Sequence, residues 1–344
     1  MAAQSRTGKL VNVAVIGATG AVGAAFLQVA AERRFPIKGL KLLATERSAG
    51  KRLRFGEGEI EVEVTRPEAL KGADFVFISA SDEASRQYGE LGRELGCVVI
   101  DDSSVWRQEP DVPLVVPEVN ADDVEAHNGI LAIPNCSTTP LVMCLWPLHR
   151  VNRVTRVIAD TYQSVSGTGA GAVRELEAQT RAWTEGREPV VEAYPHAIAF
   201  NLLPHISGFL ESGYTKEEWK MTAEARKIMH EPELPLSATC VRAPVFVGHS
   251  LAVHAEFERP ISAAEAREIL RAAPGVAVQD EPARALYPMP LDAAGKDPVF
   301  VGRIRNDISH PHGLAMWISS DNLRKGAALN AIQIAEEMIA RGLV

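Results

Sequence analysis

The stretch Val11-Asn12-Val13-Ala14-Val15-Ile16-Gly17-Ala18-Thr19-Gly20-Ala21-Val22-Gly23 decides the fold of this chain. Its first six residues are almost all apolar, which is typical of a strand buried on both faces. Three glycines at a spacing of three follow, and they permit a tight turn, close approach of the backbone to a pyrophosphate and close helix packing. The N-terminus of the following helix stabilises phosphate charge. The stretch therefore predicts a dinucleotide site, with candidate contacts at Gly17, Thr19, Gly20, Ala21, Val22 and Gly23.

Strands and helices continue to alternate through the first third of the chain. Apolar runs predict further strands at residues 40–44, 75–78, 98–100, 114–116 and 130–133, and a helix is expected at 21–33. Nearly continuous apolar strands separated by helices indicate a parallel sheet covered on both faces. The first part of the chain is therefore expected to be a Rossmann-type α/β domain.

The pattern changes after about residue 150 to longer β-branched strands, at 154–163 and 239–247, joined by helices at 171–183 and 262–272. The second of these helices opens with a possible capping box, Ser262 with Glu265. The last helix, 326–341, is amphipathic and is expected to return to the first domain. We therefore expect an α/β dinucleotide-binding domain at 1–134 and 325–344, and an α+β catalytic and dimerisation domain at 135–324.

Composition narrows the class of protein. At 344 residues the chain is long enough for two domains, and its net charge of -8 argues against a general nucleic-acid or membrane binder. The four cysteines show no metal-ligand spacing, so we expect neither disulfides nor a metal site. The first nine residues lack a signal-peptide core, and the uncharged run 129–148 contains three prolines. These features predict a soluble, cytoplasmic protein with a small-molecule substrate.

The residues after the second expected strand bear on the choice of cofactor. Glu46 could bind the ribose hydroxyls of NAD. Arg47 and Ser48 offer a guanidinium and a hydroxyl that suit the 2′-phosphate of NADP. The alternative is that Arg47 and Lys51 are simply solvated charges in a loop, but we favour NADP over NAD.

Cys136 is the most informative single residue. It lies in Pro134-Asn135-Cys136-Ser137-Thr138, between an apolar strand and an apolar helical run. A thiol at the positive end of a helix dipole is favoured as the nucleophilic thiolate. Most free cysteines are core residues, and we interpret Cys97, Cys144 and Cys240 in that way.

Polar residues further along could complete a site around this thiol. Gln163 ends a probable strand, where a neutral amide could orient a substrate. Arg242 could hold a carboxylate, and His249 could act as acid and base. Competing histidines are His205, His254, His310 and His312.

Three more charged side chains are candidates. Glu217 and Lys220 lie one turn apart on a predicted helix, where a surface ion pair is the commoner reading. Arg107 follows the exit of a sheet strand, the edge at which open α/β sheets bind ligands.

In these motifs the chain resembles the aspartate-semialdehyde dehydrogenase family. The resemblance covers nearly the whole chain and includes Gly17 to Gly23, Arg47 to Gly50, Pro134 to Thr138, Gln163 with Ser166-Gly167, Arg242 with His249, and Asp321 to Ala328. It implies NADPH-dependent reductive dephosphorylation of L-aspartyl 4-phosphate to L-aspartate 4-semialdehyde, a step toward lysine, threonine, methionine and diaminopimelate. It also implies a homodimer or homotetramer built through the second domain.

The resemblance implies a role for each residue. Cys136 would be the nucleophile, Gln163 would position the intermediate and His249 would be the acid and base. Arg242 would bind the substrate carboxylate and Glu217 its amino group, while Arg107, Asn135 and Lys220 would hold phosphate. Ser166, Gly167 and Asn322 would join the cofactor contacts. The chain departs from the family pattern at Ser81-Asp82, Gln108, Thr139-Pro140 and Thr168.

Other functions remain open at this point. A sister enzyme could reduce N-acetylglutamyl phosphate, although that group usually has Gly before the cysteine, where this chain has Asn135. Glyceraldehyde-phosphate dehydrogenase is a more distant alternative. A noncatalytic dinucleotide sensor would not need Cys136, Gln163, Arg242 and His249 together.

Overall fold

The computed structural model describes residues 9–344, so the short tail expected before the first strand falls largely outside the described residues. The chain forms two compact units. Unit 1 comprises residues up to Asn135 together with Ala327–Val344, and unit 2 comprises Cys136–Gly326. Among the described residues, no helix is both long and apolar enough to span a membrane.

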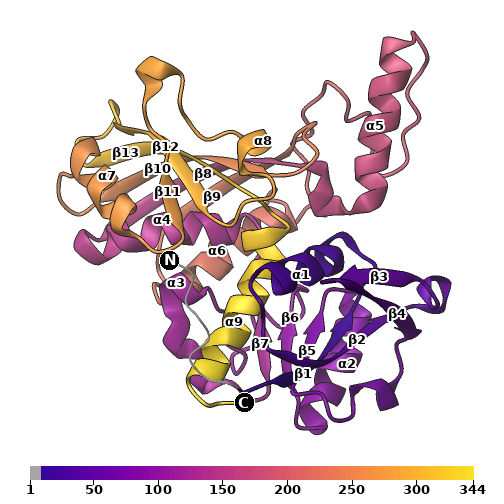
Figure 1. Ribbon diagram of the computed structural model, residues 1–344. Coiled ribbons are helices and arrows are strands. Elements are labelled where there is room, and N and C mark those ends of the chain that lie inside the picture. Colours follow the sequence, from indigo (N-terminus) through magenta and orange to yellow (C-terminus); the bar gives the residue numbers. More distant parts are fainter. Residues whose placement is uncertain (1–8) are drawn as a thin grey trace. The chain divides into compact units, whose positions relative to one another are not determined.

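Unit 1 is built on a seven-stranded sheet with the order β3-β4-β2-β1-β5-β6-β7 (Figure 1). All its neighbouring strands pair in parallel except β3 and β4, which form an antiparallel edge hairpin. The expected Rossmann-type parallel sheet is therefore confirmed. The strands are β1 (Val11–Ile16), β2 (Ile37–Ala44), β3 (Arg52–Phe55), β4 (Gly58–Val64), β5 (Phe75–Ile78), β6 (Val98–Asp101) and β7 (Ile130–Ala132).

Helices cover both faces of this sheet because its strands are apolar on both sides. On one face α1 (Ala21–Glu32) and α9 (Leu329–Ala340) contact each other and share a core with Phe75, Phe77 and Ile100. On the other face α2 (Asp82–Glu94) brings Gly92 against Val99 and Val76. Shorter helical segments are η1 (Glu46–Ser48), η2 (Pro67–Leu70), α3 (Pro117–Asn120) and η3 (Ala121–Ala126). A further segment, η6 (Arg324–Ala328), begins in unit 2 and ends in unit 1.

The turn after β1 requires glycine at its first position. Gly17 has φ +85°, and a Cβ there would lie 2.0 Å from the backbone oxygen of Ser79. Gly50 has a similar φ of +80° but open space around it. Position 17 therefore combines a strained backbone with a clash, whereas position 50 has the strain alone.

We expect Gly17→Ala to lower the free energy of unfolding by at least about 3 kcal/mol, since the clash adds to the cost of a positive φ. Gly50→Ala is the matched control and is expected to cost only about 1–2 kcal/mol. Urea unfolding of both variants measures the difference. If both variants lost the same free energy of unfolding, the turn would have shifted to relieve the contact with Ser79.

Unit 2 contains a six-stranded mixed sheet with the order β11-β12-β13-β10-β8-β9 (Figure 1). Antiparallel pairs form its centre, and the outer pairs β11–β12 and β8–β9 are parallel. The strands are β8 (Val154–Gln163), β9 (Leu236–Arg242), β10 (His249–Phe257), β11 (Val276–Val278), β12 (Val299–Asn306) and β13 (Gly313–Ser320).

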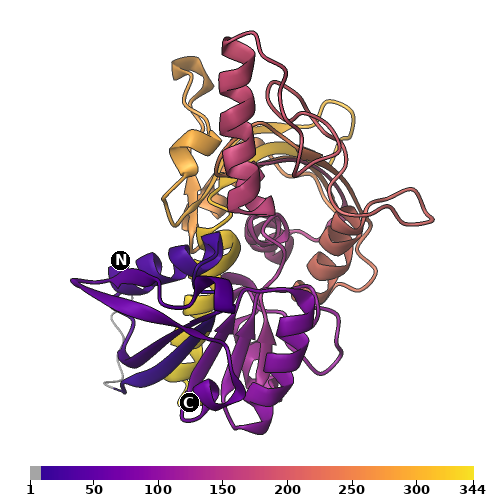
Figure 2. The ribbon, with the colours of Figure 1, turned by 90° about the vertical axis from the view of Figure 1, so that its right-hand side faces the viewer.

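A layer of three helices packs on this sheet: α4 (Thr138–Val151), α6 (Lys216–Ile228) and α7 (Ala263–Ala272). A complete capping box, Thr215 with Glu218, starts α6, whereas at α7 the Ser262 side chain accepts from Glu265 N–H. Helix α5 (Ala170–Thr184) stands apart from the sheet (Figure 2) and packs through a small core of its own. The remaining segments are η4 (Val165–Thr168), η5 (Pro282–Arg284) and α8 (Pro290–Ala293).

Two expected strands were wrong in whole or in part. Residues 114–116 form only one isolated bridge, Leu114 to Ala132, because Pro113 and Pro117 flank the segment and cannot donate to a ladder. The strand expected at 239–247 begins earlier and ends at Arg242, since Pro244 interrupts donation two residues later.

Candidate functional site

Unit 1 has a groove of about 570 Å³ at the carboxyl ends of β1, β2 and β5. This is the edge at which open parallel sheets bind dinucleotides. Its lining includes the glycine-rich turn, the segment after β2 and the start of α2: Ile16, Gly17, Thr19, Gly20, Ala44, Thr45, Glu46, Arg47, Ser48, Val64, Thr65, Ser79, Ala80, Ser81, Ala84 and Tyr88.

The groove has the donors that a phosphate group needs. The backbone at Gly20 caps α1 without any acidic residue in the first turn of the helix. Thr19 Oγ1 donates to Ser48 Oγ at 3.3 Å, so the turn and the segment after β2 meet there. Arg47 is exposed beside the buried Ser48, and Glu46 lines the same groove.

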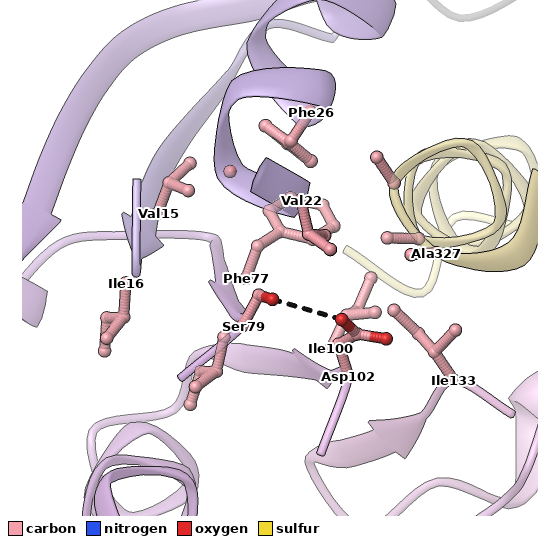
Figure 3. A pocket seen from close by; sticks show the side chains of 14 residues that line it. Val15, Ile16, Val22, Phe26, Phe77, Ser79, Ile100, Asp102, Ile133 and Ala327 are labelled. Atoms are coloured by element: carbon pink, nitrogen blue, oxygen red, sulfur yellow. Dashed lines mark hydrogen bonds between the residues drawn. The ribbon is translucent and has the colours of Figure 1, made fainter. Parts of the chain in front are cut away.

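A second, small apolar pocket of about 20 Å³ lies beneath the N-terminal part of α1 (Figure 3). Val22, Phe26 and Phe77 line it, together with Ala327. Its polar rim is Ser79, whose hydroxyl donates to Asp102 at 3.1 Å. Ile16 and Ser79 line both pockets, so the two cavities adjoin. Together they form a groove with charged residues beside a small apolar pocket.

Two of the predicted phosphate residues belong to unit 1. Arg107 is buried, and its Nη2 donates to the backbone oxygen of Asp102 at 2.8 Å. Asn135 is also buried and is the last residue before unit 2. Arg107 is thus held beside the end of β6, as expected for a residue at the sheet's ligand-binding edge.

In unit 2, Cys136 lies two residues before the start of α4, and His249 is the first residue of β10. Cys136 Sγ is 3.2 Å from His249 Nε2. Glycines leave room around this pair: a Cβ on Gly326 would lie 2.9 Å from Cys136 Cβ, and one on Gly167 would lie 3.2 Å from His249 Cε1. A thiol and an imidazole at this distance can form a nucleophile and its proton partner.

Gln163 and Arg242 lie beside each other because β8 and β9 pair in that register. Gln163 Nε2 donates to Glu217 Oε1 at 3.3 Å, and Lys220 Nζ lies 3.6 Å from Glu217 Oε2. Glu217 is only 6% exposed, so the Glu217–Lys220 pair is not the surface ion pair that is common at this helical spacing. Arg242 is 5% exposed, and its Nη1 donates to Ser164 O at 2.7 Å.

The His249 ring is fully buried, and burial is the main reason that its pKa is well below the ordinary value. The Arg242 guanidinium lowers this pKa further. The backbone N–H of Ser164 donates to Nδ1 at 3.0 Å, and the Ser164 hydroxyl also lies 3.0 Å from Nδ1. Sequence reasoning did not select Ser164, although its place between Gln163 and Ser166-Gly167 was a signal.

Asn322 lies in the same network. Its Oδ1 accepts from Gly248 N–H at 2.9 Å and from the hydroxyls of Ser164 and Ser166 at 3.1 and 3.2 Å. Its Nδ2 donates to Ser166 Oγ at 3.0 Å. Ser166 and Asn322, both predicted as cofactor contacts, are therefore linked through the Ser164 hydroxyl to Nδ1 of the imidazole.

The competing cysteines and histidines have other environments. Cys97, Cys144 and Cys240 are buried, as expected for core residues, and burial raises the pKa of each thiol. His254 pairs with Asp307, and His205 stacks on Phe209. Within residues 9–344, no cluster of three or more His, Cys, Asp or Glu residues could hold a metal ion.

Two family models match the two parts of the chain. The family model for the semialdehyde dehydrogenase NAD-binding domain matches residues 12–127, and that for the semialdehyde dehydrogenase dimerisation domain matches residues 145–325. The fold and these matches define an NAD(P)-binding oxidoreductase with a dimerisation domain.

Similar whole proteins narrow the class to one family. The chain is 52% identical to an aspartate-semialdehyde dehydrogenase of Aquifex aeolicus over 97% of this chain and 99% of that protein. It is 44% identical to the Bacillus subtilis enzyme of the same name, over 98% and 100%. The chain belongs to the aspartate-semialdehyde dehydrogenase family, whose members are oxidoreductases of amino-acid biosynthesis.

Solved structures agree with this assignment. The crystal structure of aspartate semialdehyde dehydrogenase II from Vibrio cholerae, complexed with ASA, has a TM-score of 0.94 at 42% identity and covers 96% of this chain and 98% of that one. The structure of the Candida albicans enzyme with NADP has a TM-score of 0.75 at 26% identity, over 98% and 100%.

Proposed function

We propose that the protein catalyses the NADPH-dependent reductive dephosphorylation of L-aspartyl 4-phosphate to L-aspartate 4-semialdehyde through a thioester on Cys136. The observation that carries this proposal is the 3.2 Å contact between Cys136 Sγ and His249 Nε2. Unit 2 also contains the neutral amide of Gln163, the guanidinium of Arg242 and the carboxylate of Glu217. These groups suit the acyl group, the α-carboxylate and the amino group of an amino-acid acyl phosphate.

Cys136 attacks the acyl carbon and expels phosphate, which leaves a thioester. Gln163 holds the intermediate without acting as a base, because its amide does not titrate. His249 serves as the acid and base, and it donates a hydrogen bond to the sulfur or the tetrahedral oxygen. A nicotinamide cofactor in the unit 1 groove would supply the hydride that reduces the thioester. The resulting hemithioacetal then breaks its C–S bond, which releases the aldehyde and returns the Cys136 thiolate.

The charged residues recognise the two ends of the substrate. Arg242 binds the α-carboxylate, for which its planar guanidinium is suited. Glu217 binds the amino group, and Arg107, Asn135 and Lys220 bind the phosphate. These local cations account for the binding of a doubly anionic substrate by a protein whose net charge is -8.

The cofactor would bind in the unit 1 groove. The missing Cβ at Gly17 and at Gly23, where a Cβ would lie 2.4 Å from Gly17 O, lets the turn close tightly beneath a pyrophosphate. We propose NADP because Arg47 and Ser48 stand together at the groove wall. The cofactor contacts would be Gly17, Thr19, Gly20, Ala21, Val22, Gly23, Arg47, Ser48, Ser166, Gly167 and Asn322.

Arg47→Gln is expected to raise KM for NADP by about ten- to hundredfold and to leave KM for NAD within about twofold, because a charged hydrogen bond contributes roughly 1.5–3 kcal/mol. Initial rates with each cofactor test this expectation. Arg54→Gln, an exposed arginine in β3 outside the residues that line the groove, is the control. Equal losses with NAD and NADP would contradict a 2′-phosphate contact.

We assign cofactor binding to unit 1 and catalysis and dimerisation to unit 2, whose residues match the dimerisation model. The proposed assembly is a homodimer or a homotetramer. Analytical ultracentrifugation tests this assembly, and a monomer at micromolar concentration would contradict it.

The reverse reaction tests the proposed function directly. Purified protein is mixed with L-aspartate 4-semialdehyde, phosphate and NADP, and NADPH absorbance is followed. We expect phosphate-dependent NADPH formation. Activity only with N-acetylglutamate semialdehyde would favour the sister enzyme, and no activity with either aldehyde would favour a noncatalytic dinucleotide binder.

A further inference from the structure

The buried charge of Arg242 has few partners within unit 2. Its side chain is only 5% exposed, and Nη1 donates to a neutral partner, the backbone oxygen of Ser164. Among the residues that the structure describes, no atom accepts a hydrogen bond from Arg242 Nε. Burial of a cation in this way costs free energy unless other groups stabilise the charge. The side chains that contact the guanidinium therefore bear on how it is held for a substrate.

The ring of Tyr194 is one such side chain. It lies in the irregular segment after α5, and the guanidinium carbon of Arg242 is 6.0 Å from the centroid of the ring. At this distance the face of an aromatic ring attracts a cation. Burial raises the pKa of the Tyr194 phenol, so the side chain is neutral at pH 7. Tyr194 thus offers Arg242 a ring face and not a competing anion.

A hydrogen bond fixes the far end of this tyrosine. Tyr194 Oη donates to Thr168 Oγ1 at 2.9 Å. Thr168 is the last residue of η4, which also contains Gly167. A Cβ on Gly167 would lie 3.1 Å from Arg242 Nη1, so this turn packs closely against the guanidinium. Thr168 is also a position at which the chain departs from the family pattern, and its hydroxyl is the acceptor for the tyrosine.

The backbone is anchored on both sides of Tyr194. Before it, the buried Gln179 of α5 donates from Nε2 to the backbone oxygen of Val190 at 2.8 Å. After it, Leu203 pairs with the backbone of Arg242 itself, with N–H to O distances of 3.0 and 2.8 Å. The segment that carries the ring is therefore tied to the strand that carries the guanidinium.

We propose that Tyr194 is a positioning residue for substrate recognition: its ring, fixed by Thr168, holds the Arg242 guanidinium where it binds the α-carboxylate. This inference rests on the proposed role of Arg242 in binding the substrate. A cation that is already held in place loses less conformational freedom when its ligand binds. Because the ring carries no charge, the carboxylate of the substrate does not have to displace an anion from it.

Removal of the ring tests this proposal kinetically. We expect Tyr194→Leu to raise KM for L-aspartate 4-semialdehyde by about 5- to 30-fold, the range of a desolvated cation–ring contact. The values of kcat, KM for phosphate and KM for NADP should stay within about twofold, because the loss is confined to recognition of the α-carboxylate. A general disturbance of unit 2 would lower kcat as well, so an equal fall in kcat would overturn the proposal.

Two milder variants keep the ring and remain informative if Tyr194→Leu does not fold. Tyr194→Phe removes the hydroxyl, and Thr168→Ala removes its acceptor. Each should raise KM for the semialdehyde by only about two- to fivefold. The double variant should match either single variant, because both changes remove the same interaction. Additive losses would overturn the role of Thr168 in fixing the ring.

Tyr214→Leu is the matched control. Tyr214 is an exposed tyrosine of unit 2 whose hydroxyl also meets a side chain hydroxyl, that of Ser237 at 2.9 Å. This variant should leave every KM within about twofold of the wild-type value. A rise in KM for the semialdehyde as large as that of Tyr194→Leu would overturn the assignment to Tyr194.

NMR of protein labelled with ¹⁵N-arginine reports on the contact without turnover. The Nε–H signal of Arg242 is the one lost in Arg242→Met, and Tyr194→Leu should shift it by removing the ring. Titration with L-aspartate 4-semialdehyde, without NADP or phosphate, should need about 5- to 30-fold more ligand in Tyr194→Leu. Saturable binding without turnover would contradict the proposed function alone. Turnover with an unshifted signal or an unchanged titration midpoint would contradict this inference alone.

Discussion

Replacing Cys136 with serine is expected to lower kcat for NADPH formation from L-aspartate 4-semialdehyde by at least about 1,000-fold, with little change in NADP binding. A serine hydroxyl is far less acidic than a thiol, so far less of it is present as the attacking anion. Steady-state rates and fluorescence titration with NADPH provide the two measurements.

Cys144→Ala is the matched control, because Cys144 lies in α4, the helix that begins two residues after Cys136, and is fully buried. It should keep kcat within about threefold, since it removes only a small buried group. Turnover by Cys136→Ser within tenfold of the wild type would contradict a thioester mechanism.

Replacing Arg242 with methionine is expected to lower kcat/KM for the semialdehyde by about 30-fold or more. Loss of one partner of a buried, hydrogen-bonded charge pair typically costs about 2–5 kcal/mol. Most of the effect should appear in KM for the semialdehyde, and KM for phosphate should change little. Because the guanidinium also lowers the pKa of His249, that pKa should rise in the variant.

Arg305→Met is the control, since Arg305 is an exposed arginine on β12 of the same unit. It should leave all kinetic constants near their wild-type values. If Arg242→Met raised KM for phosphate and left KM for the semialdehyde unchanged, Arg242 would belong to the phosphate site instead.

The sequence predicts the parallel core of unit 1 well because its signals are local. Residues 11–16 form an apolar strand directly before three spaced glycines, and the structure has β1 and α1 there. The β3–β4 hairpin was not predicted, although residues 58–64 alternate apolar and acidic side chains as a half-buried strand does. Residues 114–116 and 243–247 have strand propensity, but Pro113 and Pro244 prevent continuous strand pairing there.

The candidate site is less visible in the sequence because it joins distant segments. The chemistry of Cys136 and His249 could be proposed from their local context, and the structure brings them to 3.2 Å across 113 residues. The hydrogen bond between Ser164 and Asn322 spans 158 residues, and nothing in either segment indicates it. Pairing of β8 with β9 places Gln163 beside Arg242, and sequence periodicity does not define that register.

The thioester on Cys136 is the central claim, and a single-turnover experiment without phosphate tests it most directly. Enzyme is mixed with excess L-aspartate 4-semialdehyde and NADP, NADPH is counted per site, and the intact protein and its Cys136 peptide are weighed by mass spectrometry. We predict one NADPH per site, an aspartyl group on Cys136, and its release when phosphate is added. Continued NADPH formation without phosphate, or an unmodified Cys136 peptide after the burst, would contradict the mechanism.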